Sequence, residues 1–326
     1  MAVVADSWLD IAEVRIPVIP PPEHSGNINS LVLQATIGCP WNRCLFCMQN
    51  RNKNFIPRSE EVKEDIFLAK KYYGDKPKHI FLADGNSLVL RTDKLLEIIE
   101  RCFKVFPKLK RISTYGSARF ILRKDLGEMK SLSLSGLKKI YLGLESGDDA
   151  VLDYQNKGAH SKEMIKSAEI ARDIGIELSV TALMGLGGAG SWKRSAELTA
   201  QVLNIMKPPE TRPHNLIINP NSLLGEKVAK GEFKEASRHE ILKEKRLLIS
   251  LLNYKTKIHL HRFMIRGLPI EKRLPEDKDK ILKITDFVLN RFYGEPINPE
   301  KIKGYSISDV LEWDGYKDIS PLDDLK

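Results

Sequence analysis

Residues 30–47 read SLVLQATIGCPWNRCLFC, an apolar run followed at once by a loop that holds three of the chain's four cysteines. The Leu- and Val-rich start predicts a β-strand over residues 30–36. A loop that directly follows the first strand of a parallel sheet lies at the carboxyl edge of that sheet, where α/β proteins bind their ligands. The stretch therefore predicts a strand and, at its end, a site built on cysteine sulfur.

Strand-like and helix-like runs alternate along the chain from residue 30 onward. Short runs rich in Leu or β-branched residues predict strands at 30–36, 79–83, 110–114, 138–144, 176–184 and 214–219. Apolar residues at helical spacing predict helices near 59–73, 92–106, 122–132, 161–174 and 191–206. Such repeats imply parallel strands with right-handed crossovers, and so an α/β fold that is a barrel, part of a barrel or a doubly wound sheet.

The regions on either side of this repeat have a different character. Residues 1–28 include the Pro-rich run IPVIPPP and predict an N-terminal extended arm. Helices near 238–252 and 278–293, with the run KIHLHRF at 257–263 between them, predict an α-rich C-terminal extension. We therefore expect a core at 29–220 and an extension at 221–326 that covers the substrate site.

The composition indicates a globular chain without a membrane span. No apolar run approaches the roughly 20 residues that cross a bilayer, and the start lacks a basic region followed by an apolar one. We therefore expect no membrane insertion and a cytoplasmic location. The net charge of +9 suits an anionic partner such as RNA. However, Lys and Glu alternate in EEVKEDIFLAKK and HEILKEKRLL, which favours solvated helix faces over a dedicated RNA surface.

The cysteine spacing leaves two kinds of metal site to compare. Cys39, Cys44 and Cys47 provide three thiols in one loop, whereas a structural zinc site normally closes with four ligands. A four-iron cluster held by three thiolates leaves one iron open to a ligand that takes part in chemistry. The position of the loop at a sheet edge favours the cluster. Cys102 shares a helical face with Leu95 and is expected to be a buried hydrophobic residue.

Four motifs in order carry a family resemblance over residues 29–220. QATIGCPWNRCLFC, FLADGN, YLGLESG and SVTALMGLGG stand at the ends of four predicted strands, and together they resemble the radical S-adenosylmethionine superfamily, most of all its coproporphyrinogen dehydrogenase-like branch. The commonest cysteine motif of the superfamily is C-x3-C-x2-C, and here the first gap has one more residue. The resemblance implies a partial (β/α)6 TIM-like barrel of parallel strands.

The resemblance also implies a mechanism and its cofactors. Cys39, Cys44 and Cys47 would ligate an oxygen-sensitive [4Fe-4S] cluster, and S-adenosylmethionine would chelate the open iron. An electron from a donor such as ferredoxin or flavodoxin would then cleave S-adenosylmethionine to a 5'-deoxyadenosyl radical that abstracts hydrogen from substrate. The substrate is expected to be a small molecule, a nucleotide or RNA. Subclasses that need auxiliary clusters are disfavoured because no further cysteine loop is present, and no cobalamin-binding domain is expected.

The same resemblance assigns contacts to S-adenosylmethionine. The loop after the second strand would receive the methionine amino group, Lys157 its carboxylate, and Glu145 the ribose hydroxyls. Phe46 and the glycine loop after the fifth strand would lie near the adenine. For Glu145 and Lys157, ordinary surface ions are the alternative interpretation. The predicted set is Phe46, Ala83, Asp84, Gly85, Asn86, Glu145, Ser146, Lys157, Met184 and Gly185.

Two other functions remain open on the residues alone. GLGGAG, residues 185–190, fits the G-x-G-x-x-G fingerprint of an NAD-dependent oxidoreductase. That fingerprint normally follows the first strand of its fold, whereas here four predicted strands come before the strand that leads into it. A basic RNA-binding module with a structural zinc site is the second alternative. Polar residues after the late strands are candidates for substrate contact, or else strand-edge residues paired with their neighbours. They are Arg212, His214, Asn219, Asn221, His259, His261 and Arg262.

Overall fold

The computed structural model describes residues 30–47, 54–260 and 271–296, and its main sheet has eight strands. Their order is β1 (Ser30–Gln34), β4 (His79–Ala83), β5 (Arg111–Gly116), β6 (Leu137–Glu145), β7 (Glu177–Met184), β8 (Glu210–Asn215), β9 (Thr256–His259) and β10 (Glu271–Leu274). The pairs β1–β4, β4–β5, β5–β6 and β8–β9 are parallel, and β10 runs antiparallel to β9. The α/β fold with parallel strands is confirmed, with more strands than the six predicted.

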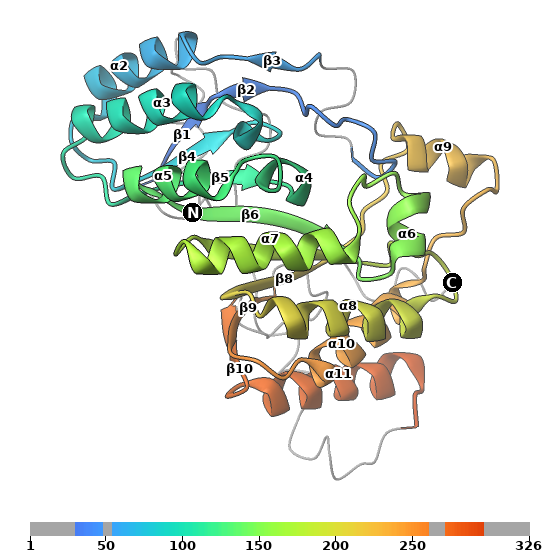
Figure 1. Cartoon of the computed structure of the whole chain (residues 1–326). Coiled ribbons are helices and arrows are strands. Elements are labelled where there is room, and N and C mark those ends of the chain that lie inside the picture. The colour runs from blue at the N-terminus through green and yellow to red at the C-terminus, as the bar shows by residue number, and fades with distance from the viewer. Residues whose placement is uncertain (1–29, 48–53, 261–270, 297–326) are drawn as a thin grey trace. The chain divides into compact units, whose positions relative to one another are not determined.

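The helices alternate with these strands as expected (Figure 1). They are α2 (Glu61–Tyr73), α3 (Thr92–Val105), α4 (Ala118–Ile121), α5 (Leu126–Ser135), α6 (Asp149–Tyr154), α7 (Ser161–Asp173), α8 (Trp192–Met206), α9 (Leu223–Ala229), α10 (Arg238–Leu251) and α11 (Lys278–Tyr293). Helix α5 starts later than the predicted residue 122 because the Asp125 carboxylate accepts from Glu128 N and caps it. A short antiparallel pair, β2 (Thr36–Ile37) and β3 (Ile56–Pro57), and the 3-10 turn η2 (Ser87–Val89) complete the elements.

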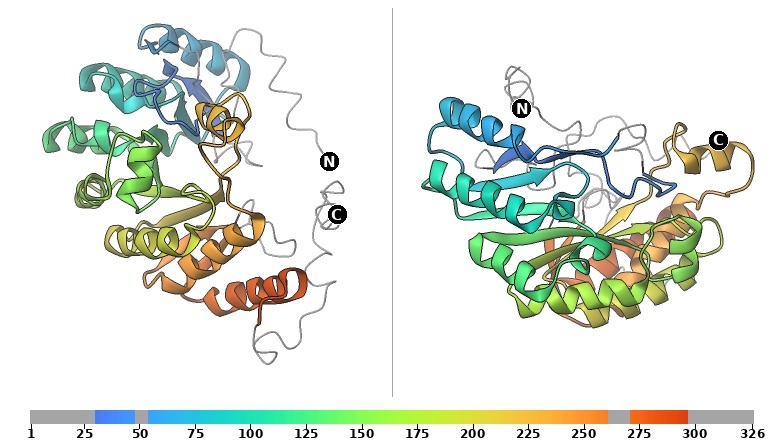
Figure 2. Two further views of the ribbon diagram at one scale, coloured as in Figure 1. Left: turned by 90° about the vertical axis from the view of Figure 1, so that its right-hand side faces the viewer. Right: turned by 45° about the horizontal axis from the view of Figure 1, so that its top comes forward.

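The chain forms two compact units. Of the described residues, unit 1 comprises 30–47, 54–144, 149–181 and 218–233, and unit 2 comprises 145–148, 182–217, 234–260 and 271–296. In unit 1, α2, α3 and α5 pack in sequence order, α2 against α3 and α3 against α5, along the strands (Figures 1 and 2). Phe81, Tyr115 and Tyr141 cluster on one face of neighbouring strands, with the Phe81 and Tyr115 ring centroids 4.8 Å apart. The predicted boundaries at residues 29 and 221 stay predictions.

A buried ion pair fixes the start of α2 on the end of β1. The Arg58 guanidinium donates to the Gln34 carbonyl at 2.6 Å and lies 3.0 Å from the Asp65 carboxylate. Both charged side chains are less than a tenth exposed, so each depends on the other for compensation of its charge. The chain therefore returns from β3 to a set position beside the cysteine loop.

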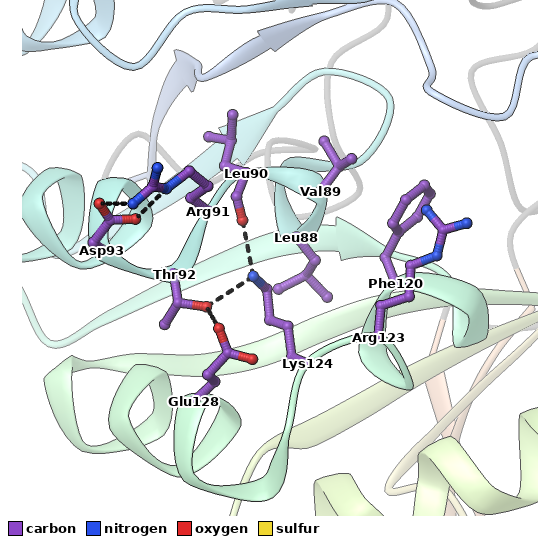
Figure 3. A pocket seen from close by; sticks show the side chains of 10 residues that line it. All are labelled: Leu88, Val89, Leu90, Arg91, Thr92, Asp93, Phe120, Arg123, Lys124 and Glu128. Carbon is purple, nitrogen blue, oxygen red and sulfur yellow. Dashed lines mark hydrogen bonds and ion pairs between the residues drawn. The ribbon is translucent and has the colours of Figure 1, made fainter.

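A surface pocket of about 490 Å³ lies in unit 1 between η2, α3, α4 and α5 (Figure 3). Lys124 Nζ donates to the Leu90 carbonyl at 2.8 Å and to Thr92 Oγ1 at 3.0 Å, and Thr92 Oγ1 donates to Glu128 at 2.6 Å. Burial lowers the pKa of Lys124. The polar groups at the floor of this pocket thus satisfy one another, and none of the predicted site residues lines it.

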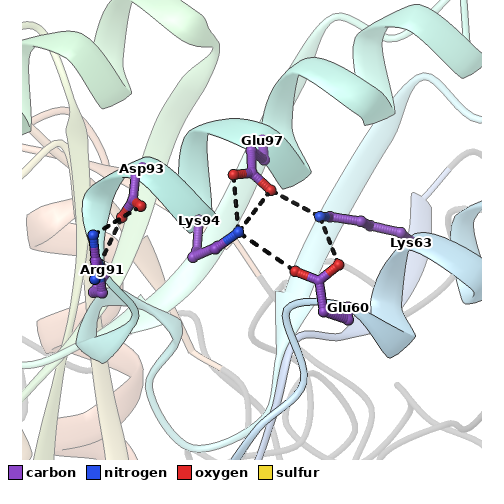
Figure 4. A network of polar contacts seen from close by, with 6 residues as sticks. All are labelled: Glu60, Lys63, Arg91, Asp93, Lys94 and Glu97. Atoms are coloured by element: carbon purple, nitrogen blue, oxygen red, sulfur yellow. Dashed lines mark hydrogen bonds and ion pairs between the residues drawn. The ribbon is translucent and has the colours of Figure 1, made fainter.

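Charged residues on α2 and α3 form an exposed network (Figure 4). Lys63 Nζ lies 2.9 Å from Glu60 and 2.8 Å from Glu97, and Lys94 Nζ lies 3.0 Å from Glu97. The hydrogen bond from Lys63 is the main cause of the lowered pKa of Glu60. Exposed pairs of this kind add little stability. The prediction of a solvated face for EEVKEDIFLAKK is confirmed at Glu60, Glu61 and Glu64, which are exposed.

In unit 2, helices α8, α10 and α11 pack in that order, α10 lying against both neighbours (Figure 2). Strand β8 begins at Glu210, four residues before the predicted 214–219, because Thr211 Oγ1 lies 2.8 Å from the Tyr254 hydroxyl and 3.0 Å from Thr256 Oγ1. The apolar run that suggested the later strand is partly in solvent, with Ile217 63% exposed. In the chain's described portion, no helix is both long and apolar enough to span a membrane. The arm at 1–28 and the residues His261 and Arg262 lie outside the described residues.

Candidate functional site

The three clustered cysteines lie in the loop that follows β1 and β2. Cys39, Cys44 and Cys47 are half-buried and form no disulfide, and Cys47 N donates to the Cys44 carbonyl at 3.2 Å. Within the described ranges, no three His, Cys, Asp or Glu side chains are gathered into a metal-binding group. The structure thus places three half-buried cysteines on one loop.

The loop after β4 packs directly against the cysteine loop. A Cβ atom on Gly85 would lie 2.2 Å from the Gly38 carbonyl oxygen and 2.8 Å from Cys39 Cα, so only glycine fits there. Asp84 is buried, and its carboxylate accepts from Gly38 N at 3.4 Å and from Gly85 N at 2.8 Å. Residues 83–86 and the cysteines therefore adjoin within unit 1, as the parallel topology predicts for the ends of neighbouring strands.

Side chains in this neighbourhood have structural partners of their own. Asn86 accepts from Leu88 N at 3.1 Å, which caps η2, and donates to Ser117 Oγ at 3.0 Å. Lys157 Nζ lies 6.0 Å from the centroid of the Phe46 ring, so these two predicted contacts are neighbours.

Burial raises the pKa of the Cys102 thiol, which is fully buried in α3 as predicted. Cys102 is thus a core residue and no partner of the three loop cysteines.

Unit 2 contains the predicted residues at the ends of β6 and β7. Glu145 ends β6 buried and with a φ of +66°, a conformation that is costly for a residue other than glycine. Ser146 Oγ accepts from Asp148 N at 3.1 Å, and the Asp148 carboxylate pairs with Arg194 at 2.5 Å. The Met184 carbonyl accepts from Leu216 N at 2.9 Å. These contacts hold the two strand ends in fixed conformations.

Helix α10 holds the glycine loop after β7 through two glutamates. Glu244 accepts from Gly185 N at 2.8 Å and Glu240 accepts from Gly190 N at 2.6 Å, one helical turn away. Burial raises the pKa of Glu244 to about 8 and lowers that of Lys245 to about 7. The interpretation of HEILKEKRLL as a solvated face is wrong at these positions, since Glu244 is 2% exposed and Lys245 is fully buried. The charge pattern gave no signal of this role.

The candidate substrate residues separate into two groups. In unit 2, Glu210 Oε2 lies 3.3 Å from His259 Nε2 and 3.5 Å from Arg212 Nη2, and His259 and Arg212 are buried. His214 is half-buried on the same strand as Arg212. Asn219 and Asn221 instead form an exposed turn in unit 1, where Asn219 accepts from Asn221 N at 2.9 Å. Contact between these residues and a substrate stays a prediction.

Residues 33–192 match the family model of the radical SAM superfamily. The chain is 24% identical over 200 residues to 4'-phospho-dehydrooxetanocin synthase of Priestia megaterium, a match that covers 55% of this chain and 27% of the synthase. It is also 24% identical over 218 residues to an uncharacterised protein of Methanocaldococcus jannaschii, covering 63% of this chain and 66% of that protein. These matches span only part of the length of both relatives.

Solved structures share the fold at low sequence identity. Coproporphyrinogen III oxidase of Escherichia coli superposes with a TM-score of 0.54 at 14% identity, covering 79% of this chain and 57% of that enzyme. A radical S-adenosylmethionine methyltransferase of Kitasatospora setae, solved with cobalamin and a [4Fe-4S] cluster bound, gives 0.51 at 18%, covering 63% and 40%. Methylornithine synthase gives 0.50 at 16%, covering 69% and 63%. The fold is that of a radical SAM partial barrel.

The family match includes the cysteine loop and runs through GLGGAG. It therefore places these glycines after a later strand of a radical SAM barrel, and the NAD-dependent interpretation is not supported; nor is the zinc-containing RNA module. Enzymes of this superfamily use a [4Fe-4S] cluster and S-adenosylmethionine. We conclude that residues 33–192 of this chain form a radical SAM domain.

Proposed function

We propose that Cys39, Cys44 and Cys47 hold the cluster and that the chain uses it to generate a 5'-deoxyadenosyl radical for hydrogen abstraction from a substrate. The observation that carries this proposal is the close packing of the cysteine loop on the loop after β4, where a Gly85 side chain would collide with Gly38 and Cys39. Three half-buried thiols free of disulfides are the donors that an iron-sulfur cluster requires. The donor set thus fits the cofactor.

When bound, the cluster supplies the electron that breaks a carbon–sulfur bond of S-adenosylmethionine. The chain's own residues then bind and orient that molecule. The ammonium of Lys157 suits a carboxylate, and the buried Glu145 carboxylate suits ribose hydroxyls. Gly85 allows close backbone approach. Phe46 is proposed to lie near the adenine and residues 83–86 to face the amino group; that Met184 and Gly185 also lie near the adenine stays a prediction.

The proposal extends to partners and setting. Chemistry with reduced thiols and a reduced cluster requires a reducing compartment, and we therefore assign the reaction to the cytoplasm with a ferredoxin or flavodoxin as electron donor. The substrate is proposed to be a small molecule, a nucleotide or RNA. Arg212 and His259 are the buried cationic and titratable side chains of unit 2 that we assign to substrate contact.

Alanine variants of the four cysteines test the assignment. Cys39→Ala, Cys44→Ala and Cys47→Ala are each expected to lose the visible absorbance of the reconstituted cluster and the reductive cleavage of S-adenosylmethionine, because alanine has no donor atom and the loop provides no other thiolate in its place. Cys102→Ala is the matched control: it removes a buried sulfur from α3 and is expected to cost about 1 kcal/mol of stability while keeping the cluster.

Iron and sulfide content and 5'-deoxyadenosine are measured for all four variants under anaerobic conditions. About four irons per chain in the wild type and in Cys102→Ala supports the proposal. Wild-type yields of 5'-deoxyadenosine from any of the three loop variants, or loss of the cluster in Cys102→Ala alone, contradict it.

A further inference from the structure

The cysteine loop has one residue more between its first two cysteines than the commonest form of the superfamily motif, and the structure shows where the chain uses this length. Between Cys39 and Cys44, Asn42 takes a left-handed φ of +45° and is exposed. Trp41, directly before this turn, is half-buried. Trp41 thus directly precedes a left-handed turn, and its indole packs on a segment outside the cysteine loop.

The indole of Trp41 is seated between a backbone turn and a guanidinium. Its Nε1 donates to the Asn156 carbonyl at 2.7 Å. A Cβ atom on Gly158 would lie 2.2 Å from the indole ring, so the ring packs directly on this turn. On the ring, the Arg119 Cζ atom lies 3.9 Å from the centroid. Such a position is favourable because the ring face is negative.

Arg119 links the two surfaces. Its Nη2 donates to the Gly158 carbonyl at 2.6 Å and its Nε to the same oxygen at 3.2 Å, so the guanidinium is held in the plane that covers the indole. The planar guanidinium of Arg119 covers the indole and donates two hydrogen bonds to the Gly158 carbonyl at the same time. The ammonium of Lys lacks this planar pair of donors. Trp41, Arg119 and the turn at 156–158 thus form one interlocked unit, which we call the tryptophan clasp.

A second anchor follows between the other two cysteines. Leu45 N donates to the Gln155 carbonyl at 3.0 Å, and the Leu45 carbonyl accepts from Leu224 N at 2.9 Å. Leu45 is buried. Each gap between consecutive cysteines thus contains one residue fixed to structure outside the loop, Trp41 in the first and Leu45 in the second. This arrangement limits how the three thiols move relative to one another.

We propose that Trp41 and Arg119 are positioning residues for the cluster: the clasp holds the lengthened loop so that Cys39, Cys44 and Cys47 present their sulfurs to one iron-sulfur cluster. This inference rests on the proposed function. A clasp that served stability alone would affect unfolding but not cluster retention. Outer contacts that orient metal ligands typically change metal affinity by about 10- to 100-fold, so the two roles give separable results.

The test uses the reconstituted protein and a matched tryptophan. Trp41→Ala and Arg119→Lys are compared with Trp192→Ala, because Trp192 also lies under a cation, with Lys243 Nζ 4.6 Å from its ring centroid, but stands in α8 of the other unit. Trp41→Phe keeps the ring and removes the Nε1 donor. The measurements are iron per chain, the rate of iron loss to a chelator, the electron paramagnetic resonance spectrum of the reduced cluster, and the thermal midpoint.

We expect Trp41→Ala to lose iron to the chelator on the order of tenfold faster than the wild type, with a broadened spectrum, and Trp41→Phe to fall between the two. Trp192→Ala is expected to keep the wild-type rate and spectrum even where its thermal midpoint drops equally. Equal rates of iron loss in Trp41→Ala and Trp192→Ala overturn the positioning role while the proposed function stands. A wild-type chain that binds no iron overturns the proposed function itself.

Discussion

The buried Glu244 carboxyl is expected to make the free energy of unfolding depend on pH. Its pKa is raised from 4.5 to about 8, chiefly by burial, in a helix that holds the glycine loop. Between these two values the folded protein binds one proton more than the unfolded chain. The free energy of unfolding therefore falls as the pH rises, by about 1.4 kcal/mol per pH unit.

Between pH 5 and 7 this effect can be isolated. Burial lowers the pKa of the neighbouring Lys245 from 10.5 to about 7. Between these two values the unfolded chain binds one proton more than the folded protein, so Lys245 changes the free energy of unfolding mainly above pH 7 and little below it. Over the two pH units from 5 to 7, Glu244 is expected to lower the stability by at most about 3 kcal/mol. Glu244→Gln keeps an oxygen acceptor for Gly185 N and removes the titration.

The assay is urea unfolding followed by circular dichroism in anaerobic buffers between pH 5 and 7. Relative to the wild type, Glu244→Gln should gain stability steadily as the pH rises. Glu240→Gln is the matched control on the same helix and loop. Burial raises the pKa of Glu240, but hydrogen bonds led by Gly190 N outweigh this and lower it, so its titration lies below the window. Parallel curves for the wild type and Glu244→Gln would refute the reasoning.

Two further substitutions test the packing around the cysteine loop. Gly85→Ala places a Cβ atom 2.2 Å from the Gly38 carbonyl and should reduce the iron bound per chain to under half, whereas Gly127→Ala, exposed on α5, should leave iron content unchanged. Arg58→Leu strands the buried Asp65 carboxylate and should cost about 3–5 kcal/mol in urea unfolding. Adding Asp65→Leu should recover most of that loss, and failure to recover it would contradict the ion-pair argument.

The spacing of apolar residues was sufficient to predict strands and helices whose buried residues recur with the period of the element. Strand β4 at 79–83 and helix α11 at 278–293 have the predicted bounds. The adjacency of Cys39 and Gly85 was also predictable, since consecutive parallel strands end at one edge of the sheet and so bring their loops together. Cys102 was identified as a core residue from helical spacing alone.

Features that depend on a distant partner were not predictable in the same way. Strand β8 starts at Glu210 because Thr211 meets Tyr254 and β9 pairs alongside, while the more apolar run after it remains partly exposed. Glu244 and Lys245 have the composition of a surface helix, and only packing on the loop after β7 buries them. The spacing of apolar residues indicates which face of a helix or strand is buried on average. It does not identify the distant group with which a single buried polar side chain forms its hydrogen bond.

The sequence by itself therefore determined the alternation of strands and helices, the family, and the three thiols with their spacing, because these depend on residue type and on periodicities of a few residues. The tertiary structure decided how the cysteine loop is held. The indole of Trp41 reaches Asn156 across 115 positions of chain, and Arg119 reaches Gly158 across 39. Contacts at such separations are set by the path of the whole sheet, which no local pattern encodes.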